Sequence, residues 1–368
     1  MREPGWGSAL RSEPHRLLFP VGAVLAWIGV LPWLLFGLRA PALYGPFQRM
    51  LGYRAFLHPI VELDGFVGCF AAGLLFTLWP RRTGASPAAG WEVAVAAIAP
   101  VASAAFGVAG RWQAAQLCSL VQLAVLVEFC ARRMSRRQEP GFLWIALGLL
   151  GGFAGSVLGL VGAARGDEGF RLHELGRDLA LQGLFTACAA GVARLMREDH
   201  RESDAVALAV DGVAAAAFLA SFWIGSQVSV QLGYAVRTVA LAAIAWPMHV
   251  SWFGPENLRR SLAHLSLWLL AFGTAWIATD PHVRRAGLHV IFLGSFSLLL
   301  TAGFFGAPLA PRRWIALSAG LFAVSMFGRV FVELDPPSFH VWMVVSSASF
   351  LGATAVWAVP GSRIGAGD

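Results

Sequence analysis

Four histidines lie in or beside apolar segments of this chain, at positions His58, His249, His264 and His289. A neutral imidazole is the commonest protein ligand for transition metals, and an intramembrane histidine also serves in proton relays. One histidine in an apolar segment is usually a hydrogen-bonded packing residue, but four are more than packing normally needs. The histidines therefore point to metal or haem-iron binding, with proton transfer as the alternative.

His58 is followed four residues later by Glu62, and this spacing places both side chains on one face of a helix. A carboxylate beside an imidazole orients a metal ligand, tunes the metal or accepts a proton. Pro59 favours the start of a helix, so an alternative interpretation is an interfacial histidine with a carboxylate in the first turn. Asp64 lies away from the shared face. Both interpretations of the pair stay open at this point.

Charged residues also occur inside other apolar segments, where burying a charge is costly. Arg177 and Asp178 are adjacent, so their side chains diverge and each needs a partner on another helix, which favours a structural role. Arg237 and Arg329 must form an ion pair, extend to the interface or bind an anionic group such as a haem propionate. Asp211 likewise needs a partner that offsets the cost of burying its charge.

The elements that carry these residues are membrane-spanning helices. Hydrophobic residues make up 57% of the 368 positions and charged residues 13%, against about 25% charged in an ordinary soluble domain. Apolar segments long enough to cross ~30 Å of hydrocarbon recur along the whole chain. We expect an all-α integral membrane protein, a polytopic bundle of about twelve transmembrane helices in one domain over residues 1–368. The expected helices cover residues 17–38, 56–79, 91–109, 112–131, 142–164, 174–196, 205–226, 231–249, 262–279, 286–308, 314–333 and 339–359.

The basic residues indicate how these helices are oriented. All 28 are arginines, and most lie in short clusters between apolar segments, which is typical of loop anchors and argues against a nucleic-acid interface. With both termini cytoplasmic, about twice as many arginines fall on the cytoplasmic side as on the outer side. The first apolar segment is longer than a signal-peptide core of about 7–15 residues, so we expect it to be retained. The four cysteines form no C-x-x-C pair, and we expect them to pack between helices.

A weak internal similarity links two segments of the chain. The segment from His58 to Pro80-Arg81-Arg82 resembles the segment from His289 to Pro311-Arg312-Arg313, with Gly and Ala-Gly at similar positions between. Repeats are common in membrane transporters. These segments fall on the second and tenth expected helices, which do not correspond in a repeat of six plus six helices. We therefore interpret the similarity as chance.

Around its histidines the chain resembles the NnrS family, bacterial membrane proteins described as containing haem and copper and linked to nitric-oxide stress. Three segments carry the resemblance. The segment from His58 to Gly84 is similar to the family's histidine-containing second helix, which ends in a Pro and Thr-Gly turn. The segments 262–277 and 287–303 are similar to its Leu-His-x-x-x-x-Trp and Leu-His-x-x-x-x-Gly helices. The three segments read HPIVELDGFVGCFAAGLLFTLWPRRTG, LAHLSLWLLAFGTAWI and GLHVIFLGSFSLLLTAG.

The resemblance implies that His58, His264 and His289 bind haem or a metal ion, with haem and copper as the cofactors. The family often shows His-x-His-Glu in the second helix, whereas this chain has His58-Pro59-Ile60-Val61, so one ligand is missing. The expected spans put His58 and His289 near the outer surface and His264 near the cytoplasmic end of its helix. We therefore expect His58, with Glu62, to pair with His289 at one metal site, and His249 to pair with His264 at a second.

The resulting hypothesis is a haem- and copper-binding protein of the bacterial inner membrane that takes part in the response to nitric oxide or nitrosative stress. Its partners would be the lipid bilayer and nitric oxide or a nitrosyl species, with no nucleic acid. The alternative is a secondary transporter or channel that uses intramembrane His, Asp and Arg as a proton or ion relay. A third hypothesis is a structural membrane subunit, in which the polar residues only hold the helices together. The sequence shows no nucleophile–base pair and no nucleotide-binding loop, so it assigns no enzymatic reaction.

Overall fold

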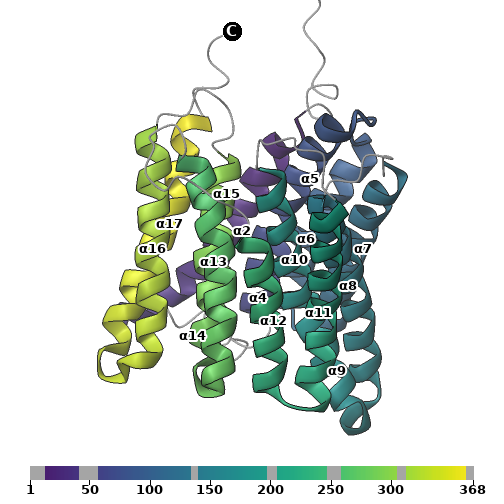
Figure 1. The fold of residues 1–368 in the computed structure, drawn as a ribbon. Coiled ribbons are helices and arrows are strands. Elements are labelled where there is room, and N and C mark those ends of the chain that lie inside the picture. The colour runs from purple at the N-terminus through teal and green to yellow at the C-terminus, as the bar shows by residue number, and fades with distance from the viewer. Residues whose placement is uncertain are drawn as a thin grey trace, which may run out of the picture. The chain divides into compact units, whose positions relative to one another are not determined.

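The computed structural model describes residues 13–40, 57–133, 140–196, 205–246, 258–304 and 312–361. Within these ranges the chain is helical apart from short turns, and no residue belongs to a strand (Figure 1). The described part of the chain contains twelve helices, of which ten are long and apolar enough to cross a membrane. The prediction of an all-α polytopic membrane protein is therefore confirmed.

We number these helices one to twelve in chain order, and their ends lie within about one turn of the expected ends. Three of them consist of several consecutive elements. The helices are α2 (His15–Gly37); α4, η1 and α5 (Leu57–Thr83); α6 (Gly90–Val108); α7 (Trp112–Arg132); α8 (Pro140–Ala164); α9, η3 and α10 (170–195); α11 (Ala205–Gln227); α12 (Val230–Ala245); α13 (Leu258–Thr279); α14, η6 and α15 (284–304); α16 (Arg312–Leu334); and α17 (Phe339–Gly361). Short 3₁₀ turns η2 (Gly166–Gly169), η5 (Pro281–Val283) and η7 (Pro336–Ser338) precede helices six, ten and twelve.

Three helices contain a π-helical segment, in which the backbone turn is wider than in an α-helix. These segments are η1 (Ile60–Val67) in helix two, η3 (Leu179–Gly183) in helix six and η6 (Val290–Phe296) in helix ten. The other nine helices, as far as they are described, are α-helical. A π segment is rare and is often found at a functional site, so these three helices are the first candidates to carry a functional site.

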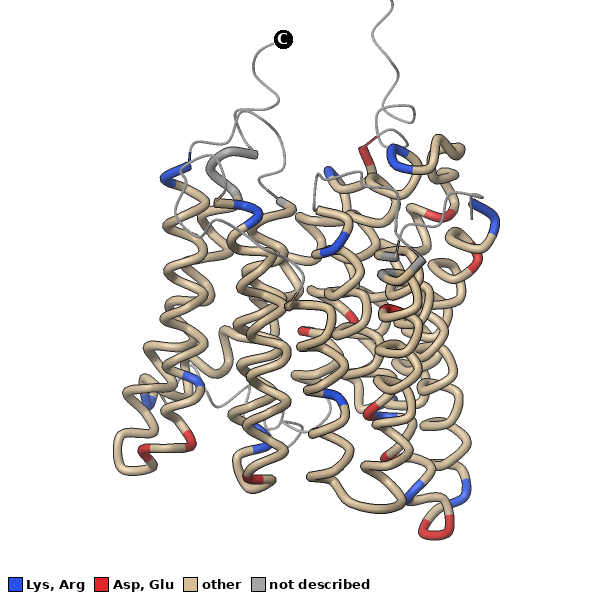
Figure 2. The backbone as a smooth tube through the Cα atoms, in the orientation of Figure 1, with Lys and Arg blue, Asp and Glu red and all other residues tan. Residues whose placement is uncertain are grey.

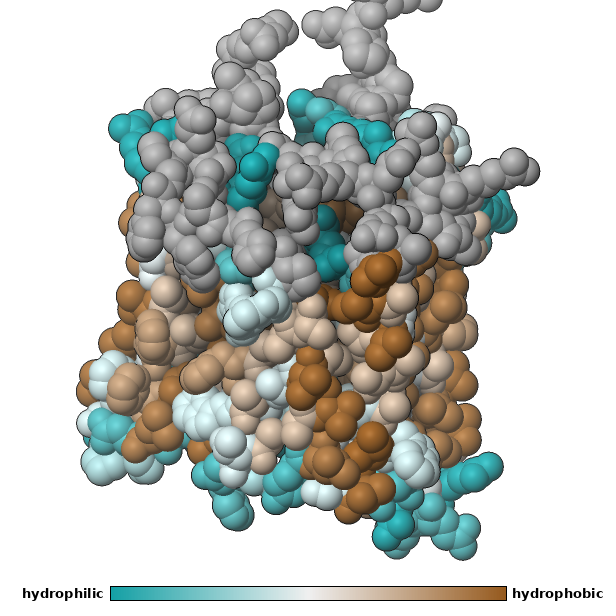
Figure 3. Space-filling model, in the orientation of Figure 1, coloured by the Kyte–Doolittle hydropathy of each residue, from teal (hydrophilic) through white to brown (hydrophobic). Residues whose placement is uncertain are grey.

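The surface of the helices suits a lipid environment. Large apolar side chains are exposed along them, including Val213 at 71% and Val239 at 69% exposure. Most charged residues lie at the helix ends, with few along the middle of each helix (Figure 2). The apolar surface likewise covers the middle of the helices, and hydrophilic side chains gather toward their ends (Figure 3). In water such a surface would be unfavourable, whereas lipid tails are as apolar as these side chains.

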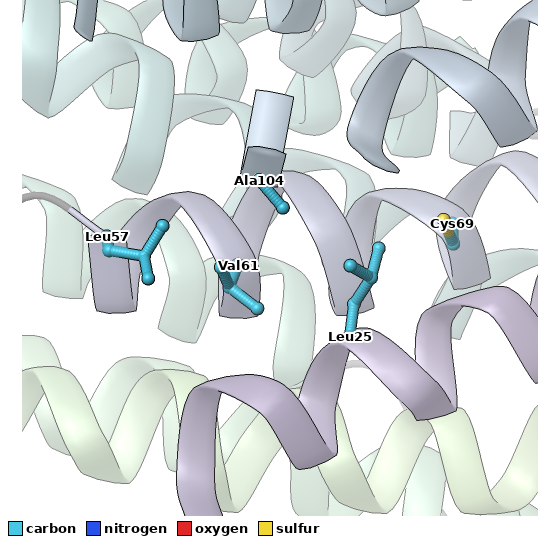
Figure 4. Packing of buried hydrophobic residues seen from close by; sticks show 5 residues of the cluster. All are labelled: Leu25, Leu57, Val61, Cys69 and Ala104. Atoms are coloured by element: carbon cyan, nitrogen blue, oxygen red, sulfur yellow. The ribbon is translucent and has the colours of Figure 1, made fainter. Parts of the chain in front are cut away.

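The chain forms two compact units, each with its own core. Unit one contains Met1–Pro32, Gly45–Gln138 and Ala146–Cys188, and unit two contains Trp33–Tyr44, Glu139–Ile145 and Ala189–Asp368. In unit one, a buried cluster joins helix two to its neighbours in helices one and three (Figure 4). In unit two, a second cluster joins helix ten to helix eleven. The members of the clusters are Leu25, Leu57, Val61, Cys69 and Ala104 in unit one, and Ala286, Val290, Met326 and Val330 in unit two.

Candidate functional site

Helix two begins with the predicted pair His58 and Glu62. His58 lies in the first turn and is half-buried, and Pro59 follows it at the start of η1. Glu62 points toward helix one, where a Cβ atom on Gly29 would clash with its carboxyl oxygen Oε1. Within the described residues, Oε1 of Glu62 is buried and accepts no hydrogen bond. A buried carboxylate oxygen without a donor is costly, so this group is a candidate to hold a proton or a cation.

Asp64 points to a different neighbour from Glu62, as the sequence predicted. Its Oδ2 accepts a hydrogen bond of 2.9 Å from the Ser119 hydroxyl of helix four. Ser119 in turn lies 3.1 Å from the hydroxyl of Ser103 on helix three. The Ser103 hydroxyl also lies 2.9 Å from the carbonyl oxygen of Ala115 on helix four, to which it donates its single proton. Helices three and two are therefore each joined to helix four, the first through Ser103 and the second through the Ser119–Asp64 hydrogen bond.

A small cavity of unit one adjoins Asp64 and Ser119. Its volume is about 20 Å³, which is room for about one water molecule. Gln122 and Cys188 also line it, and the Gln122 amide donates a hydrogen bond of 3.4 Å to the carbonyl oxygen of Ala96. The cavity thus presents carboxylate, hydroxyl and amide groups in the middle of apolar helices. Such a setting is suited to a bound water molecule or a small cation.

His289 starts the π segment of helix ten. Its Nδ1 lies 2.7 Å from the carbonyl oxygen of Arg285, one turn earlier on the same helix. A carbonyl oxygen can only accept, so Nδ1 carries the proton and Nε2 keeps its lone pair. This is the tautomer that binds a metal through Nε2, with the other nitrogen oriented by a carbonyl group.

His264 on helix nine is arranged differently. Its side chain is 4% exposed, and its Nε2 accepts a hydrogen bond of 3.0 Å from the Trp268 indole. The Nε2 lone pair is therefore engaged, and binding a metal would require His264 to break this bond. An added Cβ on Gly273 of helix nine would lie 2.7 Å from Ile291 of helix ten, so His289, two residues before Ile291, lies at about the height of Gly273. His264 precedes Gly273 by nine residues on helix nine, which is ~13 Å at 1.5 Å per residue. His264 and His289 therefore do not share one metal ion.

The other expected ligands divide between the units. His58 and Glu62 belong to unit one, whereas His264 and His289 belong to unit two. His249 lies outside the described residues. In the described part of the chain, no group of three His, Cys, Asp or Glu side chains is close enough to hold a metal ion. A haem iron needs only one or two axial imidazoles, and His289 fits that requirement. The described residues do not fit a copper site with three clustered donors.

The remaining intramembrane charges are structural. Arg177 forms a 2.6 Å ion pair with Glu174, and Asp178 accepts a 3.3 Å hydrogen bond from Gln182. Both partners lie on the same helix, whereas the sequence analysis expected partners on other helices. For Arg177 that expectation was wrong, because the i, i+3 spacing already brings Glu174 beside it.

Asp211 is held by partners from two other helices of unit two. Arg194 forms a 2.6 Å ion pair with one carboxylate oxygen, and the Trp144 indole donates a 3.1 Å hydrogen bond to the other. Both oxygens therefore have a donor. The guanidinium group of Arg194 also donates to the carbonyl oxygen of Ile244. This network connects helices five to eight and leaves no carboxylate oxygen for a ligand.

The other two buried arginines also have partners within unit two. Arg237 is 2% exposed, donates a 3.1 Å hydrogen bond to Ser221, and lies over the ring of Phe222 at 3.8 Å. Arg329 lies 3.7 Å from Glu333 one turn away. Hydroxyl, aromatic and carboxylate groups therefore stabilise these cations where lipid would not.

The fold and these groups define a polytopic α-helical membrane protein with a histidine on each of the three π-containing helices of its described part, and with the carboxylates Glu62 and Asp64 on helix two. The chain matches the NnrS protein family over residues 9–360, nearly its whole length. It therefore belongs to the NnrS family. No curated protein matches the chain.

Sequence reasoning did not find the partners of Glu62 and Asp64. Gly29, Ser103, Ser119 and Gln122 are common residue types in membrane helices, and nothing in their spacing marks them. Their role depends on which helix faces meet, which is decided by packing between segments distant in sequence. A serine or glutamine inside an apolar segment was the only available signal.

Proposed function

We propose that this NnrS-family protein binds haem and copper in the bacterial inner membrane and acts in the response to nitric oxide or nitrosative stress. The observation that carries the proposal is the hydrogen bond from His289 Nδ1 to Arg285, which presents Nε2 as the metal-binding nitrogen. Membership of the family supports the same direction. Bound haem would supply an iron centre able to bind nitric oxide.

Each residue proposed to hold a cofactor has a separate task within its own unit. In unit two, His289 would hold the iron through Nε2, and its carbonyl partner on Arg285 would fix the ring orientation. In unit one, His58 would be a further imidazole ligand, with Glu62 in the next turn as a carboxylate that holds a proton. No copper coordination is assigned to the described residues, for the reason given above, and no residue is assigned a catalytic step.

The first experiment is an absorption spectrum of the detergent-purified protein, oxidised and reduced, with iron and copper content measured on the same sample. We expect a redox-responsive Soret band that is lost in His289→Asn. Asparagine can still donate to the Arg285 carbonyl oxygen but has no second nitrogen for iron. His282→Asn is the matched control because His282 is exposed in the turn just before helix ten. A protein that stays colourless and metal-free after haemin and copper are supplied would refute the proposal.

The proposed orientation places both termini in the cytoplasm. It rests on the positive-inside distribution of arginine, since clusters such as Arg81-Arg82 and Arg312-Arg313 fall on the same side as the termini. A reporter that is active only outside the cytoplasm should be silent when fused to the C-terminus. The same reporter should be active when it is inserted after Arg165, beyond helix five.

A second candidate function is proton or ion transfer, and one observation favours it. The hydrogen-bonded pair Ser119 and Asp64 lines a water-sized cavity, and a water molecule there would be placed to exchange a proton with the carboxylate. In this case, proteoliposomes should show a pH-gradient-driven flux that Asp64→Asn abolishes. An unchanged flux in Asp64→Asn, or no flux in the wild type, would exclude this function.

A further inference from the structure

The helices that contain π segments are evenly spaced along the chain. Among the described residues they are helices two, six and ten, so each lies four helices after the previous one. Each carries a histidine ahead of its π segment: His58 before η1, His173 before η3 and His289 before η6. His173 was not among the ligands expected from the sequence or from the family resemblance.

The sequence spacing of the three helices is nearly constant. His173 follows His58 by 115 residues, and His289 follows His173 by 116. An arginine lies 24 residues after each histidine, at Arg82, Arg197 and Arg313. In helices two and six, a Gly-x-Phe sequence also begins ten residues after the histidine, at Gly68 and Gly183.

Helix packing follows the same grouping of four helices. The first helix of each group packs against the second near the histidine-bearing turn. In the first group Gly29 faces Glu62, in the second the Gly159 carbonyl oxygen faces His173, and in the third Gly273 faces Ile291. These contacts all lie in the C-terminal half of the first helix.

The third and fourth helices of each group form a hairpin that polar side chains hold together. Short connections join α6 to α7, α11 to α12 and α16 to α17, and these pairs are among the most extensively packed in the described chain. In each hairpin a serine of the third helix binds the fourth helix. The pairs are Ser103 with Ser119, Ser221 with Arg237, and Ser325 with Ser346.

A repeat of four helices accounts for the similarity between the segments that follow His58 and His289. Helices two and ten do not correspond in a six-plus-six arrangement, but they occupy equivalent positions in a four-plus-four-plus-four arrangement. We propose that the chain consists of three tandem four-helix repeats and that His173 is a third metal-binding imidazole, equivalent to His58 and His289. Its ligand would be a haem iron or a copper ion, and this part of the inference rests on the proposed function.

The geometry of His173 matches that of His289. Its Nδ1 lies 3.0 Å from the carbonyl oxygen of Gly159, so Nδ1 carries the proton and Nε2 keeps the lone pair. His264, which lies on the first helix of its group, differs because the lone pair of its Nε2 already accepts a hydrogen bond from Trp268. The ligand-ready tautomer therefore occurs at two of the three equivalent positions, and helix six is the one that sequence comparison with the family left unassigned.

The test compares His173→Asn with His173→Ala, His289→Asn and the exposed control His282→Asn. Asparagine keeps a donor for the Gly159 carbonyl oxygen but removes Nε2, so it separates ligation from a structural role. Apo-protein in lipid nanodiscs is titrated with haemin and, separately, with Cu(I) against a competing chelator. We expect His173→Asn to lower the affinity for one of the two probes, haemin or Cu(I), by about tenfold or more. Substituting even an outer-shell partner of a metal causes a loss of this size. His282→Asn should bind like the wild type.

Each outcome decides a separate point. If the wild type binds neither haemin nor Cu(I), the proposed function and the ligand role of His173 both fail. If the wild type binds and only His289→Asn loses affinity, the proposed function stands and the inference about His173 is overturned. If His173→Ala loses affinity but His173→Asn does not, the hydrogen bond to Gly159 is the whole contribution and the inference is again overturned. Independently of the variants, ¹⁵N NMR of the wild type should show an unprotonated Nε2 at His173, and a protonated Nε2 contradicts the inference.

Discussion

The carboxyl group of Glu62 on helix two lies where a side chain on Gly29 of helix one would have to go. Helices one and two therefore pack closely at the position of a buried acid. The absence of a side chain at residue 29 creates the space, and the wide turns of η1 bring the carboxyl group to it. A polar group in an apolar contact of this kind is a functional candidate and a source of instability at the same time.

Gly29→Ala should destabilise the protein because the new methyl group displaces the Glu62 carboxyl. Overpacking of a tight contact typically costs about 1–3 kcal/mol, which outweighs the gain of up to about 1 kcal/mol from better helix propensity. Gly320→Ala is the control, since nothing lies within 4 Å of its added methyl group. Thermal unfolding in detergent should show a lower midpoint for Gly29→Ala and no loss for Gly320→Ala. Equal midpoints for the two variants would mean that the contact between Gly29 and Glu62 has room for a methyl group.

Ser119→Ala should remove the hydroxyl donor of Asp64 and leave a buried carboxylate oxygen without it. We expect a loss of about 1–3 kcal/mol in the free energy of unfolding. Ser156→Ala is the matched control because Ser156 donates only within its own helix, to the carbonyl oxygen of Gly152. Both variants would be compared with the wild type by unfolding in a mild detergent with a chemical denaturant. A larger loss for Ser156→Ala would show that the Ser119–Asp64 bond contributes little.

Arg194→Ala should be among the most destabilising single changes in unit two. It removes one partner of a largely buried ion pair and leaves the Asp211 carboxylate, whose side chain is 2% exposed, without its cation. Breaking such a pair typically costs about 3–5 kcal/mol. Arg177→Ala breaks the exposed pair with Glu174, which is worth about 0–1 kcal/mol. Measured unfolding free energies that are similar for the two variants would contradict the structural role assigned to Arg194.

His264→Ala should leave haem binding intact while lowering stability, in contrast to His289→Asn. The physical reason is that Nε2 of His264 already accepts the hydrogen bond from Trp268. Trp268→Phe removes that donor and should allow His264 to bind haemin or Cu(I) in addition to the amount that the wild type binds. Titration of the three variants with both probes checks this. Loss of the Soret band in His264→Ala would instead make His264 a ligand, as the family resemblance implied.

Asp335, in the turn between helices eleven and twelve, should make stability depend on pH in the acid range. Hydrogen bonds from the Trp342 indole and from Ser338 hold the pKa of Asp335 below its ordinary value. A group with a lowered folded-state pKa contributes stability that is present above the unfolded pKa of about 3.9 and is lost as the pH falls through the folded value. Asp335→Asn should therefore show a flatter dependence of the unfolding midpoint below about pH 4. The same slope in both proteins would show that the bonds to Asp335 do not persist in solution.

The helices could be predicted from the sequence because lipid imposes a minimum apolar length on each of them. The separation of Glu62 from Asp64 also followed from helix periodicity and is confirmed by their different partners, Gly29 and Ser119. The π segments could not be predicted, because no residue type marks a wider turn and tertiary packing selects it. The partners of Arg177 and Asp178 lie at the i, i+3 and i, i+4 positions, so helix periodicity alone brings Glu174 and Gln182 beside them.

The assignment of His289 as a ligand stays a prediction, made from residue type and from the family resemblance. The tautomer that leaves its Nε2 unprotonated depends on a backbone carbonyl group, which has no sequence signal. His264 has the same residue type and a similar apolar surrounding, and a neighbouring indole occupies its nitrogen. The sequence therefore identifies the imidazoles, and the packing decides which of them can act.

The contact between helices five and six has a consequence for the synthesis of the protein. The first part of helix six carries Arg171, Glu174, Arg177 and Asp178, so it would not partition into a bilayer alone. Gly155 of helix five approaches the backbone of helix six so closely that an added Cβ would lie 2.7 Å from the Gly176 carbonyl oxygen. We therefore expect the insertion of helix six into the bilayer to depend on its packing against helix five, which is itself strongly apolar.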